Sequence, residues 1–244
     1  MNVNFTHTPD SKVSGKIIRM TQVHKSRKSD NPFIETIWHT ESLDNGVYLA
    51  TPDASWDLII AINADGSKLA FLTGQATKPQ EIPYEKGSSS LVVSFTPGAY
   101  MPEYPGDTLL DKVEFLPNFD ENHFMLAGHT FAFPTFETAE QLIEKLVNLG
   151  ILASDKIVDD VMKGKRAALS ERAVQRHFVR TTGMTQKYLE QIHRAQLAVR
   201  LLKRGEKPLD AAADAGYTDQ SRLSKSLKKI MNRKPSDITE IHKL

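Results

Sequence analysis

The sequence contains no cysteine in its 244 residues. This absence excludes a disulfide framework, a thiolate nucleophile, Cys-ligated zinc and iron–sulfur clusters, and it is consistent with a reducing compartment. Long apolar runs are also lacking, because the longest aliphatic stretch, residues 58–62, is far shorter than the roughly 18 residues of a membrane span. The first ten residues show no basic stretch followed by an apolar one. We therefore expect a cytoplasmic protein with neither a secretion signal nor a membrane span.

Net charge is nearly absent as well, at +1 with neutral histidines, but the charges are distributed unevenly. Residues 1–150 hold 11 Lys and Arg against 19 Asp and Glu, a net charge of −8, whereas residues 151–244 hold 20 against 11, a net charge of +9. A basic region joined to an acidic one is typical of proteins that bind a polyanion, most often nucleic acid. A solvated basic helix surface is the alternative, and charge alone does not separate the two.

Short apolar runs alternate with turn signals before residue 136, which predicts a β-rich region over about residues 32–134. Residues 1–31 are polar and lack clear periodicity, so we expect them to form an N-terminal arm. A helical apolar period after Thr138 completes a domain of residues 32–150, and this helix either packs on the sheet or makes a subunit contact. The expected strands include residues 47–49, 56–62, 69–72 and 91–95.

Helical periods continue after residue 150 and predict an all-α domain over residues 151–244. Ser170 and Thr185 are favoured N-cap residues, and Gly183 between them supplies a left-handed helix end. The expected helices in this stretch are residues 155–163, 170–182 and 185–204.

A second helix pair follows in a shorter form. Pro208 begins a short helix, Gly216 permits a tight turn, and Asp219 caps the next helix. A short helix, a glycine turn and a second helix with a polar, basic outer face are typical of a helix-turn-helix unit, whose second helix enters the major groove of DNA. The expected core positions of this pair are Leu209, Ala212, Ala213, Leu223, Leu227 and Ile230.

At these residues the sequence resembles the AraC/XylS family of bacterial transcription regulators. The resemblance covers about residues 155–240 and implies two helix-turn-helix units held apart by a long connecting helix, so that both recognition helices enter successive major-groove segments. It depends on Leu169-Ser170, Gln175-Arg176, Phe178 and Thr182-Gly183-Met184 in the first unit, and on Ala215-Gly216-Tyr217-Thr218-Asp219-Gln220-Ser221, Leu223-Ser224-Lys225 and Pro235-Ser236 in the second.

The resemblance implies that polar residues on both recognition helices contact DNA. Arg side chains suit guanine and Gln side chains suit adenine, whereas we expect Lys228 on phosphate, where a contact positions the protein without reading sequence. A solvated helix face is the alternative for each residue. The expected DNA-binding residues are Arg172, Gln175 and Arg176 on the first helix, and Gln220, Ser221, Ser224, Lys225 and Lys228 on the second.

Three departures from the family pattern bear on these expectations. The turn before Ser170, residues 164–169, is longer than a standard tight turn, which predicts an irregular first unit. Lys225 stands where the family often has Arg, and because Lys cannot form the planar bidentate fork, we expect weaker sequence selectivity there. Asn232 stands where the family usually has Gly, and Asn tolerates the left-handed conformation.

The first domain resembles, more loosely, the N-terminal β domain of one branch of these regulators, in Trp38 and in residues 52–58, 74–79 and 95–99. The implied fold class is a multidomain α+β protein, with an N-terminal, β-rich, small-barrel, sensor-like domain followed by the all-α domain. The resemblance implies effector binding or dimerisation, but the sequence does not identify a ligand. Aromatic residues that either line a pocket or form plain core are Trp38, Tyr48, Trp56, Tyr100 and Tyr104.

We therefore expect a bacterial DNA-binding transcription regulator without enzymatic activity, catalytic residues or cofactors. The expected partner is double-stranded DNA, with a small-molecule effector, a second copy of the chain and RNA polymerase as open alternatives, and no membrane. Two alternative functions stay open: a regulator without an effector, and a metal-dependent β-barrel enzyme fused to a regulator-like domain. A third, an alkyl-transfer DNA-repair protein, is excluded because its acceptor is a thiolate and the sequence has no Cys. The nearest metal ligands, His39, His123 and His129, form no His-x-His pair, so we expect no metal site.

Overall fold

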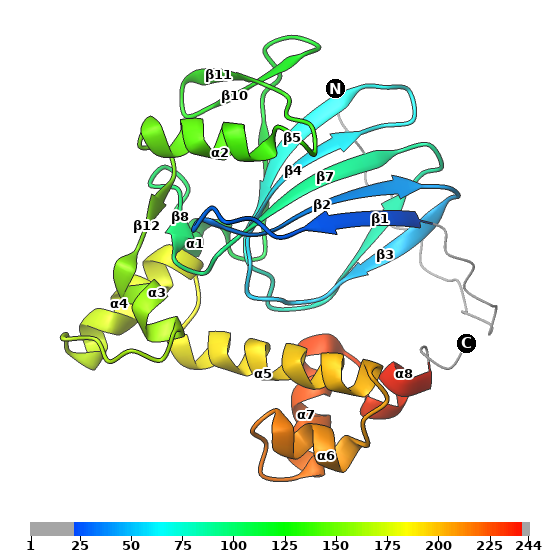
Figure 1. Ribbon diagram of the computed structural model, residues 1–244, viewed down its shortest axis with the longest axis vertical. Coiled ribbons are helices and arrows are strands. Elements are labelled where there is room, and N and C mark those ends of the chain that lie inside the picture. The colour runs from blue at the N-terminus through cyan, green and yellow to red at the C-terminus, as the bar shows by residue number, and fades with distance from the viewer. Residues whose placement is uncertain (1–21, 241–244) are drawn as a thin grey trace.

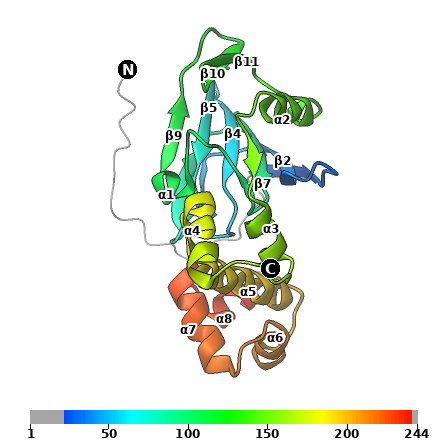
Figure 2. The ribbon, with the colours of Figure 1, turned by 90° about the vertical axis from the view of Figure 1, so that its left-hand side faces the viewer.

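The computed structural model describes residues 22–240, and Figures 1 and 2 show a β-rich part above a helical part. The strands are β1 (Gln22–Arg27), β2 (Ile34–Ser42), β3 (Gly46–Ala50), β4 (Asp57–Ile62), β5 (Lys68–Thr73), β6 (Gln80–Tyr84), β7 (Ser89–Phe95), β8 (Ala99–Tyr100), β9 (Val113–Leu116), β10 (His123–Leu126), β11 (His129–Ala132) and β12 (Ala153–Ser154). The helices are α1 (Gly106–Leu109), α2 (Ala139–Asn148), α3 (Lys156–Met162), α4 (Glu171–Thr182), α5 (Gln186–Lys203), α6 (Pro208–Asp214), α7 (Gln220–Met231) and α8 (Pro235–Glu240). The prediction of a β-rich region followed by a helical one is confirmed.

The main sheet has six antiparallel strands in the order β1-β2-β7-β4-β5-β9. Among residues 22–240 no ladder joins β1 to β9, so this sheet is open and does not close into the small barrel that the resemblance implied. Strands β3 and β6 form a separate two-stranded sheet, in which Pro83 pairs with Val47. Proline cannot donate a ladder hydrogen bond, so its presence in β6 favours an edge position and opposes extension of the sheet across that strand.

Strand β1 lies within the segment expected to be a polar arm. It pairs with β2 at the edge of the sheet, and most of its side chains are exposed. Arg27, at its end, donates to the Glu140 carboxylate of α2 at 2.8 Å and lies over the Phe136 ring. The strand is therefore polar because it is an edge strand with little apolar surface to bury. Residues 1–21 of the expected arm lie outside the described residues.

The core of the β domain lies between one face of the sheet and α2. Ile37, Leu58, Leu72 and Val93 point from neighbouring strands into this core and are almost completely buried. The apolar face of α2 covers them, as Figure 1 shows, so the helix predicted after Thr138 packs on the sheet. The buried side chains of α2 are Ala139, Leu142, Ile143 and Leu146.

A second core fills the helical domain and extends into the β domain. Ala54, from the loop before β4, is fully buried in it, and Leu110, which follows α1, packs against it. Gln196 of α5 donates from Nε2 to the Pro52 carbonyl at 2.6 Å. The two domains therefore share an interface of apolar contacts and directed hydrogen bonds.

The backbones of α1 and α4 approach each other closely at two glycines. A Cβ atom on Gly106 would lie 2.6 Å from both the Gly183 nitrogen and the Thr181 carbonyl oxygen. Gly183 has a φ of 71° and ends α4 in the left-handed conformation that the sequence predicted. This contact places the acidic β domain against the end of the first expected recognition helix.

Candidate nucleic-acid interface

The first helix-turn-helix unit consists of α3 and α4, joined by residues 163–170. Ser170 caps α4, because its hydroxyl accepts a hydrogen bond from the Ala173 N–H at 3.3 Å. Glu171 follows in the first turn, where the helix dipole favours a negative charge. The cap and the long connection agree with the sequence predictions.

Asp155 fastens α3 to α4. Its side chain is only 3% exposed, and one carboxylate oxygen accepts from the N–H groups of Ile157 and Val158, which caps α3. The other oxygen lies 2.7 Å from Nδ1 of His177 and 3.2 Å from the Thr181 hydroxyl, both on α4. Burial alone raises the pKa of this carboxyl, but the hydrogen bonds, chiefly from His177, outweigh burial and hold the pKa below its ordinary value.

The outer face of α4 carries the residues expected to read DNA. Arg172, Gln175 and Arg176 are all exposed, and their side chains make no hydrogen bond or ion pair with any described residue. One turn further, Arg180 donates to the Tyr100 hydroxyl of β8 at 3.3 Å and lies over its ring. The first three side chains are thus available to a partner, whereas Arg180 is engaged with the β domain.

The second unit consists of α6 and α7. Asp219 caps α7 by accepting from the Arg222 N–H at 2.7 Å, and Asn232 ends it with a φ of 52°. Both features were predicted from the sequence. The predicted core positions Leu223, Leu227 and Ile230 are buried as well.

Two predicted core positions of α6 are wrong. Leu209 is 63% exposed and Ala213 is also exposed, whereas Ala211 and Ala212 are buried. The helix has only seven residues, so its apolar pattern is compatible with more than one inward face. The contact with α5 and α7 selects the face that carries the small alanines.

The expected reading residues of α7 lie together on its outer side. Gln220, Ser221 and Lys225 are exposed and have no side-chain partner among the described residues. The half-buried Ser224 donates from its hydroxyl to the Gln220 carbonyl at 2.9 Å, and the exposed Lys228 donates to the Asn232 side chain at 2.8 Å. All eight predicted residues therefore lie on α4 or α7 with at least part of the side chain accessible.

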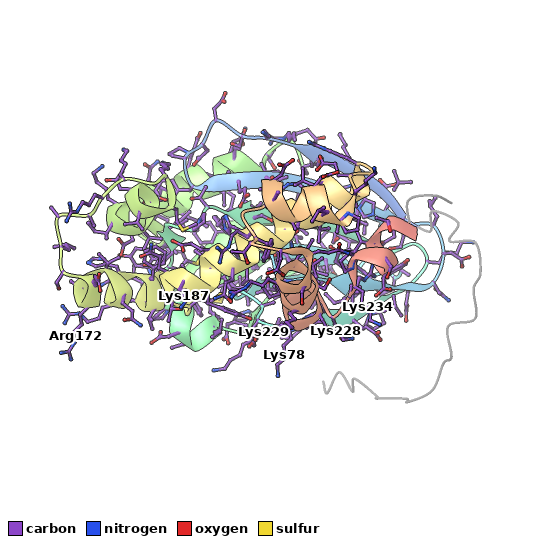
Figure 3. All side chains as sticks on the ribbon, turned by 90° about the horizontal axis from the view of Figure 1, so that it is seen from below. Lys78, Arg172, Lys187, Lys228, Lys229 and Lys234 are labelled. Carbon is purple, nitrogen blue, oxygen red and sulfur yellow. The ribbon has the colours of Figure 1, made fainter. Side chains whose placement is uncertain are left out.

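The long helix α5 separates the two units. Thr185 caps it, its hydroxyl accepting from the Tyr188 N–H at 3.2 Å. Figure 3, which views the molecule from below, shows Arg172 of α4 toward one end of this side and Lys228 of α7 toward the other, with Lys187 of α5 between them. Both recognition helices thus present cations to the same side of the molecule.

A family model described as a helix-turn-helix domain matches residues 164–240, from the turn before α4 to the end of α8. The carboxy-terminal domain is an AraC-type helix-turn-helix domain. The match covers α4 to α8 and begins after α3.

Comparison with solved structures finds ToxT from Vibrio cholerae. One ToxT structure is 8% identical, with a TM-score of 0.41, and the similarity covers 89% of this chain and 98% of that one. A second, bound to (E)-4-(8-methylnaphthalen-1-yl)but-3-enoic acid, is 10% identical with a TM-score of 0.41 over 90% of this chain and 99% of that one. No curated protein matches the sequence. The assignment of the helix-turn-helix domain depends on the family match and not on these distant similarities.

A polar cavity of about 370 Å³ lies between the second face of the sheet and α5 of the helix-turn-helix domain. Its sheet side includes Glu35, Trp38 and Asp53, and its helix side includes His193 and Arg200. Of the aromatic residues considered for a pocket, Trp38 lines this cavity. In contrast, Trp56 is buried in the core, where it stacks on Phe95.

A part-buried hydrogen-bond chain connects the cavity wall to Asp57. The Trp38 indole donates to the Ser94 hydroxyl at 3.2 Å, and that hydroxyl donates to Asp57 at 2.6 Å. Burial, reinforced by the nearby negative charge of Asp53, raises the pKa of Asp57 to about 7. Ionising Asp57 is therefore unfavourable in the native protein.

An open groove of about 390 Å³ lies between α1 and α4. Asp107 lines it from the β domain, and Arg172, Gln175 and Arg176 line it from the recognition helix. These three α4 residues remain exposed. The acidic half of the chain therefore borders the expected reading face of α4 without covering it.

Among residues 22–240, no group of three or more His, Asp or Glu side chains has an arrangement that could hold a metal ion. His123 lies against Asp120, and His129 lies against the Ala127 carbonyl. Within the same residues, no helix is sufficiently long and apolar to cross a membrane.

The sequence did not identify two exposed lysines beside the predicted set, Lys187 in the first turn of α5 and Lys229 on α7. Helical periodicity indicated both as surface positions, but their proximity depends on how α7 packs on α5. Figure 3 also places Lys78, from the β domain, on this side of the molecule. No local sequence feature distinguishes Lys78 from other surface lysines.

Proposed function

We propose that this protein is a sequence-specific DNA-binding transcription regulator, acting in the compartment that holds the DNA. The observation that carries the proposal is the pair of capped helices α4 and α7, which present unpartnered polar and basic side chains on one side of an AraC-type helix-turn-helix domain. The net charge of +9 over residues 151–244 supports an interaction with a polyanion.

In this proposal the two helices have distinct sets of contacts. Arg172, Gln175 and Arg176 read base edges from α4, with Arg176 suited to a bidentate contact with guanine. Lys228 contacts phosphate and contributes affinity without sequence information. On α7 the base-reading residues are Gln220, Ser221, Ser224 and Lys225.

The proposal is tested by titrating the full-length protein with DNA from its own upstream region and with random duplex, over a range of salt. We expect tighter binding to the upstream DNA, with an affinity that falls steeply as salt increases, because bound cations release counterions from DNA. Equal binding to both duplexes would place the specific site elsewhere or indicate a missing effector. Absence of binding to every duplex at low salt would refute the proposal.

Single substitutions separate the two proposed roles. We expect Arg176→Ala to cost about 1–3 kcal/mol on a specific site and little on random duplex. We expect Lys228→Ala to weaken binding to both duplexes similarly and to reduce the salt slope by about one. Equal losses for Arg176→Ala on specific and random DNA would exclude a base-reading role for this side chain.

We further propose that the β domain modulates DNA binding through the cavity between the sheet and α5. Its walls come from both domains, so an occupant would favour one arrangement of the domains over others. Ligands carrying both a hydrogen-bond-donating cation and an acceptor are the first to screen, because Glu35 and Asp53 face His193 and Arg200 across the cavity. A ligand that binds only the native state raises the unfolding temperature, so thermal unfolding detects it. Binding by a second copy of the chain and by RNA polymerase stays a prediction.

A further inference from the structure

The loop between β5 and β6 is fixed at the boundary between the two domains. The N–H and the hydroxyl of Thr77 each donate to the Asp111 carboxylate at 2.6 Å. From the opposite domain, the Tyr188 hydroxyl of α5 donates to the Thr77 carbonyl at 3.2 Å. The loop thus has hydrogen bonds on both sides, and the residue that follows, Lys78, has a defined position.

Lys78 is exposed beside cations of the helix-turn-helix domain. The Lys229 ammonium of α7 lies 5.6 Å from the centre of the Tyr188 ring, the same ring whose hydroxyl holds the loop. Lys187 is exposed next to Tyr188 on α5, and Lys228 is exposed next to Lys229 on α7. Figure 3 shows Lys78 pointing to the same side as these three lysines. We call the four residues together the lysine surface: Lys78, Lys187, Lys228 and Lys229.

The lysine surface continues the proposed DNA interface. Its α7 members adjoin the expected reading face of that helix, and phosphate groups flank any base sequence that α7 would read in the major groove. Two acids lie near this surface: Asp111, whose two carboxylate oxygens already accept hydrogen bonds from Thr77, and Asp237, which interacts electrostatically with Lys228. The surface therefore presents donors with net positive charge.

We propose that Lys78 contacts the DNA phosphate backbone, so that the acidic β domain is itself part of the DNA interface. This inference rests on the proposed DNA-binding function and adds a residue that lies outside the helix-turn-helix domain. It also connects the domain arrangement to DNA affinity, because a separation of the domains at Tyr188 would move Lys78 away from the other lysines.

The test measures DNA affinity of the full-length protein against salt concentration for Lys78→Ala. One phosphate contact contributes about 0.9 to the slope of log affinity against log salt. If the variant and the unchanged protein bind equally at 1 M salt, the variant should therefore bind up to about eightfold more weakly than the unchanged protein at 0.1 M salt. We expect a similar loss on specific and random duplex. The matched control is Lys145→Ala, which removes an exposed lysine of the same domain from α2, at the opposite end of the molecule.

A second variant tests whether the loop's attachment matters. Tyr188→Phe keeps the ring beneath Lys229 but removes the hydrogen bond to the Thr77 carbonyl. We expect Tyr188→Phe to weaken DNA binding when Lys78 is present. Combined with Lys78→Ala, it should cause no further loss, because both substitutions act through the same contact.

The outcomes separate this inference from the proposed function. If the unchanged protein binds DNA and Lys78→Ala has the same slope and affinity as Lys145→Ala, the inference is overturned and the DNA-binding function stands. If the unchanged protein binds no duplex, both are overturned. A Lys78→Ala loss of about one phosphate contact, with Lys145→Ala unaffected, supports the inference.

Discussion

Removal of the Asp155 carboxylate tests how the first recognition helix is held. In Asp155→Ala, α3 loses its N-cap, which costs about 0.5–2 kcal/mol. The buried Thr181 hydroxyl also loses the Asp155 acceptor, and an unsatisfied buried polar group costs about 1–3 kcal/mol. We therefore expect the free energy of unfolding to fall by about 1.5–5 kcal/mol, with weaker DNA binding because α4 is no longer fastened to α3.

Two further variants isolate these contributions. Asp155→Asn retains a side-chain oxygen that can cap α3, so we expect about half the loss. Asp219→Ala removes the exposed cap of α7, which serves as a matched control with an expected loss of about 1 kcal/mol. Urea unfolding of the full-length chain gives each value, provided that the slope with denaturant is unchanged. A loss for Asp155→Ala no larger than that for Asp219→Ala would refute the fastening role.

The pH dependence of the same variants provides an independent check. The pKa of Asp155 in the native protein lies below its ordinary value of 3.8, so the native state favours the ionised form. The resulting stabilisation is present above about pH 4 and is lost as the pH falls through the native pKa. The stability gap between the unchanged protein and Asp155→Asn should therefore close in acid, whereas a gap independent of pH would contradict this explanation.

Three other substitutions have distinct expected outcomes. The pKa of Asp57 is raised to about 7, so ionisation of this carboxyl destabilises the native state as the pH rises from about 4 to about 7. Over that range Asp57→Asn should gain about 1–3 kcal/mol of stability relative to the unchanged protein. Parallel pH curves from urea unfolding of the two proteins would contradict this. Gly183→Ala would bring a Cβ within 2.5 Å of the Gly106 carbonyl oxygen, whereas Gly205→Ala, also at a positive φ, would meet nothing within 4 Å. The first should therefore lower the unfolding temperature more than the second, and equal shifts would show that the α1–α4 contact is tolerant. Leu209→Ala should cost less than about 0.5 kcal/mol because the side chain is exposed, and a loss of 2–5 kcal/mol would indicate that it is buried as the sequence suggested.

The sequence by itself determined much of the helical domain. Ser170, Thr185 and Asp219 cap their helices as predicted, and Gly183 and Asn232 end theirs in the left-handed conformation. These features depend on residues within one helical turn of each other, so the local sequence contains the necessary information. The same locality explains why the outer faces of α4 and α7 could be placed from the sequence. The DNA-binding role of the eight residues on these faces comes from the family resemblance and stays a prediction.

Only the tertiary structure decided which distant segments meet. The pairing of β1 with β2, the open order of the main sheet and the exposure of Leu209 depend on contacts that no local pattern encodes. The same holds for the carboxylate of Asp155 against His177 of α4, and for Lys78 beside the lysines of α5 and α7. Hydrogen bonds within one turn follow from the sequence of that turn, whereas contacts across sheets and domains depend on how complete elements bury their apolar faces.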